Sequence, residues 1–145
     1  MTGVLRLAVV TALAGTAVTV GAYQLAAGSS SSALGPGTVE VDVDVHYTHF
    51  TPDHLTVRRG TLVHFVVRNH DPIRHELIVG PPEVHARHAS GHEAVHPPVP
   101  GEVSVEPDAT AETVYEFGQV GTVIFACHLP GHDEYGMNGQ VEVVD

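Results

Sequence analysis

The chain has 145 residues, which is enough for one domain with its own core. Its formal net charge is −11 and it contains no lysine, so binding to nucleic acid or to anionic lipid headgroups is disfavoured. Fifteen glycines and ten prolines among many valines are typical of short strands joined by tight turns.

The N-terminal segment differs from the rest of the chain. Arg6 is followed by an apolar run over residues 7–23, which is the layout of a signal peptide and is nearly long enough to span a bilayer. Residues 1–27 are therefore predicted to be a signal peptide or a membrane-anchor helix, and the Gly/Ser-rich residues 28–37 a flexible linker. Both alternatives predict an exported, extracytoplasmic domain, either secreted or anchored.

Residues 38–145 are predicted to form one all-β domain. Val39 to Val45 alternate strictly between apolar and acidic side chains, as in a strand with one buried face. Further strands are predicted within the ranges 54–69 (two strands about an Arg59-Gly60 turn), 73–80, 111–127 (two strands) and 138–145. Residues 81–102 break the pattern and are predicted to be a long loop that can include a short helical turn, with no amphipathic helix outside the N-terminus. The pattern indicates a sandwich or a barrel.

The single cysteine, Cys127, lies at the end of a predicted strand, where Val123, Phe125 and Cys127 share one face. In an exported protein a lone cysteine is a buried bystander, a reactive thiol or a metal ligand. His132 and Met137 follow at intervals of five residues, in the loop before the last strand. One strand-to-strand loop can bring these three side chains to a single point.

Thiolate and thioether ligands favour copper, and imidazole suits copper in both oxidation states. A site with two histidines, one cysteine and a weak bond to methionine is the blue-copper arrangement. His75, at the start of a predicted strand after a proline-containing turn, is the best candidate for the second histidine. Zinc accepts Cys and His, but a Met ligand is unusual for it.

The pattern Cys-x4-His-x4-Met, with His75 upstream, resembles the cupredoxins, the plastocyanin- and azurin-like small blue copper proteins. The resemblance covers roughly residues 39–145, including the Gly60 turn and Asn69 before the histidine. It implies a Greek-key β-sandwich and one type 1 copper held by His75, Cys127, His132 and Met137. It also implies single-electron transfer between redox partner proteins. Glu76 departs from the Asn that often follows this histidine in plastocyanins and azurins.

Other functions remain open. The first alternative is an extracytoplasmic copper carrier or storage protein that delivers copper to a cuproenzyme. Enzymatic activity is not expected, because Met137 fills the fourth position and no second complete ligand set is evident. The chain is expected to be a monomer with unidentified redox partners and a possible membrane tether through its N-terminus.

Five further histidines have two interpretations each. His85, His88, His92 and His96 lie at offsets of three and four residues, so they form a solvated segment or a weak auxiliary copper site. His128 follows Cys127 but should point to the opposite face, where it could be an electron exit or contact a second metal.

Overall fold

The structure is a computed structural model that describes residues 32–91 and 99–145. The predicted signal or anchor, residues 28–31 of the predicted linker, His92 and His96 lie outside the described residues. The described elements are β1 (Gly37–His46), β2 (His49–Thr51), β3 (His54–Arg58), β4 (Thr61–Asn69), β5 (His75–Gly80), α1 (Pro82–Ser90), β6 (Glu102–Val105), β7 (Thr110–Phe117), β8 (Gly121–Ala126) and β9 (Asn138–Val144). No helix within the described ranges has the length and apolarity needed to cross a membrane.

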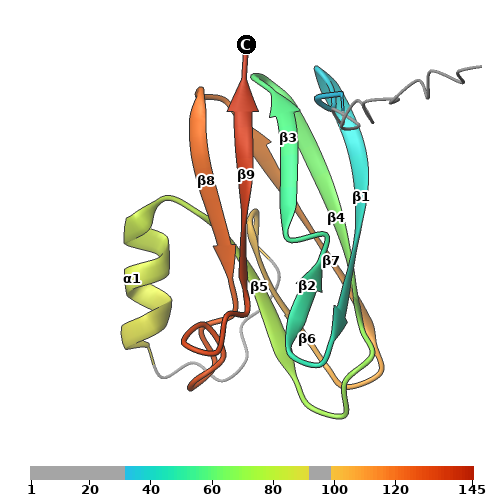
Figure 1. Ribbon diagram of the computed structural model, residues 1–145, viewed down its shortest axis with the longest axis vertical. Helices are drawn as coiled ribbons and strands as arrows, with labels where there is room; N and C mark the ends of the chain where they lie inside the picture. Colours follow the sequence, from blue (N-terminus) through green and yellow to red (C-terminus); the bar gives the residue numbers. More distant parts are fainter. Residues whose placement is uncertain (1–31, 92–98) are drawn as a thin grey trace, which may run out of the picture.

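The strands form two stacked sheets, which confirms the predicted all-β sandwich (Figure 1). One sheet has the order β2-β1-β4-β7 and the other β3-β9-β8-β5-β6. The turn at Arg59-Gly60 separates β3 from β4 as predicted, but the two strands lie in different sheets. β7 and β8 are likewise separated between the sheets. The sequence pattern did not predict the short strands β2 and β6.

The core lies between the two sheets, as the alternation of β1 requires. Val41, Val43 and Val45 are buried against the other sheet, whereas Glu40 and Asp42 face outward. Aromatic side chains add to this packing, for example the edge-to-face pair of Phe50 and Phe125 with ring centroids 5.5 Å apart. Burial on one face of β1 fixes its pairing register, because a slip of one residue would expose the valines.

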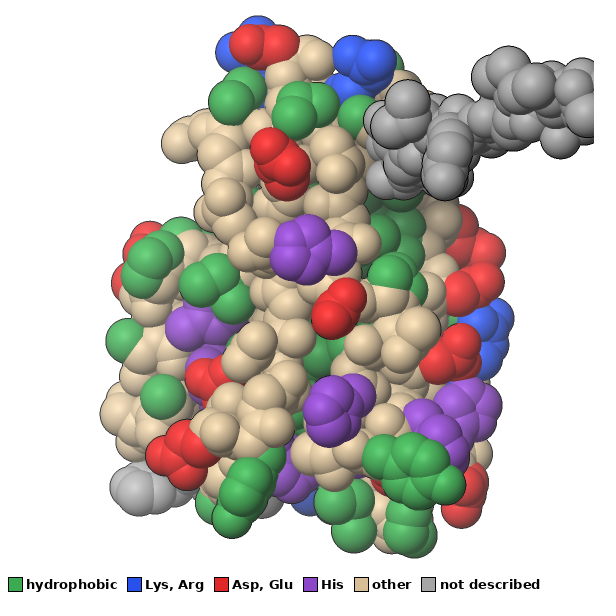
Figure 2. Space-filling view, in the orientation of Figure 1, with side chains coloured by type: hydrophobic (Ala, Val, Ile, Leu, Met, Phe, Trp, Pro, Cys, Tyr) green, Lys and Arg blue, Asp and Glu red, His purple; other side chains and the backbone are tan. Residues whose placement is uncertain are grey.

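The outer face of the four-stranded sheet carries paired histidines and carboxylates. His64 on β4 lies between Glu40 on β1 and Glu112 on β7, with Nδ1 3.4 Å and Nε2 3.0 Å from their carboxylate oxygens. His64 thus pairs with carboxylates on both neighbouring strands. Figure 2 shows histidine side chains from the middle of the molecule towards its lower end. The connection between β8 and β9 lies in this lower half (Figure 1).

The prediction of a loop over residues 81–102 was wrong for its first part. Pro82 to Ser90 form the helix α1, which begins with a proline in its first turn and ends at the Gly91 N–H bonded to the His88 carbonyl. Pattern analysis missed this helix because none of its residues is buried and it lacks an apolar stripe. α1 packs beside the five-stranded sheet through contacts with β5 (Figure 1).

Gly139, at the start of β9, provides a test of how tightly the metal-site end of the sandwich is packed. A Cβ at this position would overlap the Phe125 ring and the Asp53 carbonyl oxygen. We expect Gly139→Ala to lower the free energy of unfolding by about 1–3 kcal/mol, as overpacking does. Urea denaturation would measure the loss. Gly118→Ala is the matched control, since its Cβ would meet no atom within 4 Å. Equal midpoints for the two variants would contradict the packing described here.

Candidate metal centre

The loop between β8 and β9 is closed by its own backbone. The Cys127 N–H donates to the Met137 carbonyl at 3.1 Å, and the Met137 N–H donates to the His132 carbonyl at 3.0 Å. Gly131 and Gly136 have positive φ angles of 85° and 93°. These conformations let the chain turn tightly just before His132 and just before Met137. The three predicted ligands of this loop are thereby held together, with Cys127 and Met137 fully buried.

His75 reaches the same point from the first residue of β5. Its Nδ1 lies 3.2 Å from Nδ1 of His132, and Sγ of Cys127 also lies 3.2 Å from Nδ1 of His132. The donor atoms of His75, Cys127 and His132 all lie within 4.8 Å of one another. Within residues 32–91 and 99–145, no other three donor atoms of this kind lie so close to one another.

These separations fit a single bound metal ion. With bonds of about 2.0–2.1 Å to nitrogen and about 2.3 Å to sulfur, a separation of 3.2 Å corresponds to ligand–metal–ligand angles of about 95–105°. Such angles are close to those of a tetrahedral arrangement. A thiolate, two imidazoles and a nearby thioether are soft and intermediate donors, and this combination favours copper over hard cations.

Asp71 orients the His75 ring, and sequence analysis did not identify it. Its Oδ2 accepts a hydrogen bond from Nε2 of His75 at 3.0 Å, and its carboxylate also accepts the backbone N–H groups of Tyr47 at 2.7 Å and Thr48 at 2.8 Å. A carboxylate only accepts, so neutral His75 carries its proton on Nε2 and directs the Nδ1 lone pair towards the centre. The only signal in the sequence is an aspartate four residues before the histidine.

Glu76 ties the two halves of the centre together. Its side chain is buried, and Oε1 accepts a hydrogen bond from the His128 backbone N–H at 2.8 Å. This contact joins β5, which carries His75, to the residue that follows Cys127. The sequence showed a Glu here where plastocyanins and azurins often carry Asn, but it did not show the partner of this Glu.

Burial sets the protonation of the predicted ligands. Burial, together with the nearby charges of Glu76 and Asp133, raises the pKa of the Cys127 thiol to about 12, although backbone hydrogen bonds oppose this shift. Burial also lowers the pKa values of His75 and His132. At neutral pH the imidazoles are therefore neutral donors, and the thiol remains protonated until a cation stabilises the thiolate.

Three of the remaining predicted histidines, His85, His88 and His128, lie on the other side of Cys127. His128 points away from the core, as strand parity predicted, and its ring meets His85 and His88 of α1. Burial and the nearby His85 lower the pKa of His128. The structure thus brings two of the four histidines of the predicted auxiliary group together with His128.

Comparisons with known proteins identify the fold. Reduced auracyanin from Roseiflexus castenholzii matches with a TM-score of 0.61 and 18% identity, covering 75% of this chain and 100% of auracyanin. Auracyanin A, a "blue" copper protein from Chloroflexus aurantiacus, matches with a TM-score of 0.58 and 23% identity, covering 74% and 99% of the two chains. The protein therefore has the cupredoxin fold, as the ligand pattern predicted.

Among curated sequences the chain resembles the copper-resistant cuproprotein CopI of Rubrivivax gelatinosus. The two are 39% identical over 97 residues, which cover 65% of this chain and 59% of the relative. The aligned region thus spans little more than half of that relative's length. No family model matches the chain.

Replacing Asp71 tests its role in holding this end of the domain. Burial alone would raise the pKa of Asp71, but hydrogen bonds from Thr48, Tyr47 and His75 outweigh it, and the pKa is lowered from 3.8. We expect Asp71→Asn to lower the free energy of unfolding by about 1.5–3 kcal/mol at pH 6–7, because charge-assisted hydrogen bonds are lost.

The loss should depend on pH in a defined direction. A carboxylate with a lowered pKa stabilises the fold above its unfolded pKa and loses that contribution as the pH falls through its folded value. The difference between wild type and Asp71→Asn should therefore shrink below about pH 4. Urea denaturation at several pH values measures it, and Asp44→Asn, on an exposed pair with His70, is the control. Identical stability of wild type and Asp71→Asn across this range would contradict the assignment.

Proposed function

We propose that this chain is an extracytoplasmic copper protein that holds one copper ion between His75, Cys127, His132 and Met137. The observation that carries the proposal is the convergence of His75, Cys127 and His132, with donor atoms within 4.8 Å of one another beside a buried methionine. When bound, copper supplies a centre that gains and loses one electron. The name of the Rubrivivax relative, a copper-resistant cuproprotein, supports copper as the metal.

We further propose that the site carries single electrons between redox partner proteins as a type 1 centre. His75, Cys127 and Met137 are fully buried, which keeps water from the donors, and His132 is only partly buried at the surface end. The closed loop and the anchored His75 ring hold the donors in one arrangement. Cu(I) and Cu(II) prefer different geometries, and donors that move little hold a compromise between them, so an electron can arrive or leave with little rearrangement.

The second candidate is a carrier or storage protein that delivers copper in copper resistance, and the relative's name favours it. In that role the metal itself would leave, which requires the loop 127–137 to open. The backbone hydrogen bonds that close this loop, together with full burial of three of the four donors, support the electron carrier instead.

Several features of this proposal rest on the sequence. Four protein donors leave no open position for substrate, so we propose no enzymatic activity. The N-terminal pattern supports export, either by secretion or with the N-terminal segment kept as a membrane anchor. The acidic surface and the absence of lysine support small redox proteins, rather than nucleic acid, as partners of a monomer.

The experiment that tests this function is the visible and EPR spectrum of the full chain with one equivalent of Cu(II). A type 1 site gives an intense thiolate-to-copper band and narrow copper hyperfine splitting. Cys127→Ser should lose the band while the sandwich stays folded by circular dichroism. A pale, ordinary tetragonal signal in wild type, or a full band in Cys127→Ser, would overturn the ligand assignment.

The two candidate roles separate in a mixing experiment on the copper-loaded chain. The reduced protein is mixed in turn with an outer-sphere oxidant and with a Cu(I) chelator. An electron carrier should be oxidised rapidly with its copper retained, and should lose copper to the chelator slowly. Rapid loss of copper with slow oxidation would favour the carrier or storage role.

Met137→Leu tests the fourth donor. Leucine has a similar volume and keeps the buried packing but lacks the thioether sulfur. We expect the charge-transfer band to remain and the reduction potential to rise, because the oxidised ion loses more from a missing donor than the reduced ion. Voltammetry measures the potential. An unchanged potential would mean that Met137 packs in the core without reaching the metal.

A further inference from the structure

A cluster of three imidazoles lies behind the predicted metal centre, on the opposite side of the Cys127 backbone. His85 and His88 come from α1, and His128 directly follows Cys127. Nδ1 of His85 lies 2.8 Å from Nε2 of His128, and the His88 ring stacks on the His128 ring with centroids 6.2 Å apart. We call these three residues the histidine cluster.

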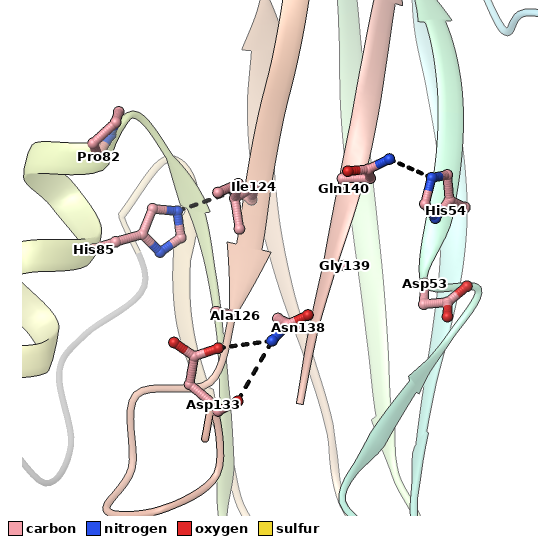
Figure 3. Close-up of a pocket in the computed structure, with 10 residues that line it drawn as sticks. All are labelled: Asp53, His54, Pro82, His85, Ile124, Ala126, Asp133, Asn138, Gly139 and Gln140. Atoms are coloured by element: carbon pink, nitrogen blue, oxygen red, sulfur yellow. Dashed lines mark hydrogen bonds between the residues drawn. The ribbon is translucent and has the colours of Figure 1, made fainter. Parts of the chain in front are cut away.

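The outer nitrogen of His85 is anchored to the backbone. Its Nε2 lies 3.1 Å from the Gly80 carbonyl and 3.2 Å from the Ile124 carbonyl, and Figure 3 shows the second of these contacts. Carbonyl oxygens only accept, so Nε2 carries the proton and Nδ1 presents its lone pair to His128. Histidines that bind metals are commonly fixed in this way by an acceptor on the other nitrogen.

The outer nitrogen of His88 is held by a carboxylate. Nε2 of His88 lies 2.9 Å from Oε2 of Glu102, and both side chains are largely buried. In the neutral ring the proton therefore sits on Nε2, and Nδ1 is the basic nitrogen. A carboxylate–histidine pair of this kind fixes the tautomer and the orientation of the ring.

The surroundings of the cluster are anionic. The buried Glu76 carboxylate accepts the His128 backbone N–H at 2.8 Å, and Oδ2 of Asp133 lies 4.0 Å from Nδ1 of His128. Glu102 adds a third carboxylate, which it shares between His88 and Arg87. These groups favour a divalent cation in a partly buried place.

The spacing of the two nearest nitrogens fits two ligands of one ion. Imidazole–metal bonds of about 2.0 Å place adjacent nitrogens about 2.8 Å apart at an angle of about 90°, which is the separation of His85 Nδ1 and His128 Nε2. A right angle between nitrogens is the arrangement that tetragonal Cu(II) prefers. His88, one turn along α1 from His85, stacks on the His128 ring and would supply a third donor through a side-chain rotation.

We propose that His85 and His128, completed by His88, form a second metal site that binds a divalent transition-metal ion, Cu(II) in a copper-rich medium. The site lacks a thiolate and a thioether, so it favours Cu(II) over Cu(I), in contrast to the first centre. His128 adjoins Cys127 in the chain, so one peptide unit connects the two sites. The proposal does not require the first centre to be type 1.

The test uses the full chain with its first centre filled by one equivalent of Cu(II) to a constant thiolate-to-copper band. A second equivalent is then added, and bound copper is measured by equilibrium dialysis and by EPR. We expect one further Cu(II) with a tetragonal signal and hyperfine lines from coordinated nitrogen. We also expect the first centre's signal to broaden, because two paramagnetic ions joined through adjacent residues couple magnetically.

Matched variants separate this cluster from other histidines. His85→Gln should weaken the second binding event by more than tenfold and leave the first band unchanged. Glu102→Gln should weaken it by about 10-fold or more, as loss of a ligand's carboxylate partner does. His54→Gln, at an exposed residue that begins β3, and the double variant His92→Gln/His96→Gln should bind as wild type does.

Three results would overturn the second site. They are no second ion bound by wild type, unchanged binding in both His85→Gln and His128→Gln, or loss of binding in the His92→Gln/His96→Gln control alone. Failure of the proposed function is a different observation, the absence of the charge-transfer band at the first equivalent. In that event the second site is still tested with Zn(II) by dialysis, using the same variants.

Discussion

The antiparallel pairing of β5 with β8 is the contact on which the metal centre depends. It places Ile78 opposite Ala126 and Val79 opposite Phe125, so the first residue of β5 lies beside the loop that leaves β8. His75 thereby meets Cys127 and His132, although a long stretch of chain separates them. The buried bond from the His128 N–H to Glu76 extends this pairing past the end of β8.

Charge at the centre is balanced by buried groups rather than by solvent. Asp71 is ionised and engaged by two backbone N–H groups and His75, and a second carboxylate, Glu76, lies beside the Cys127 loop. Burial keeps the Cys127 thiol protonated in the metal-free protein. A bound cation would balance the negative charge of a thiolate in these surroundings. Carboxylates near Cys127 therefore suit a metal site and disfavour a thiolate without a metal.

The side chains of Cys127 and His128 lie in two chemically different environments. Successive side chains of an extended chain point to opposite sides, so Cys127 enters the core while His128 faces α1. The core side gathers sulfur and imidazole donors, and the α1 side gathers imidazoles and carboxylates. The helix is required for the second environment, because it supplies His85 and His88 at a spacing of three residues.

Local pattern alone determined the ligand loop and all the strands except the short β2 and β6. Both signals are local: one is the alternation from Val39 to Val45, and the other is the spacing of Cys127, His132 and Met137. They can be recognised in the sequence without knowing which strands pair. The tertiary structure alone decided the assignment of β3 and β4 to different sheets, the polar helix α1, and the partners of Asp71 and Glu76. These features depend on contacts between residues far apart in the chain, which local periodicity does not encode.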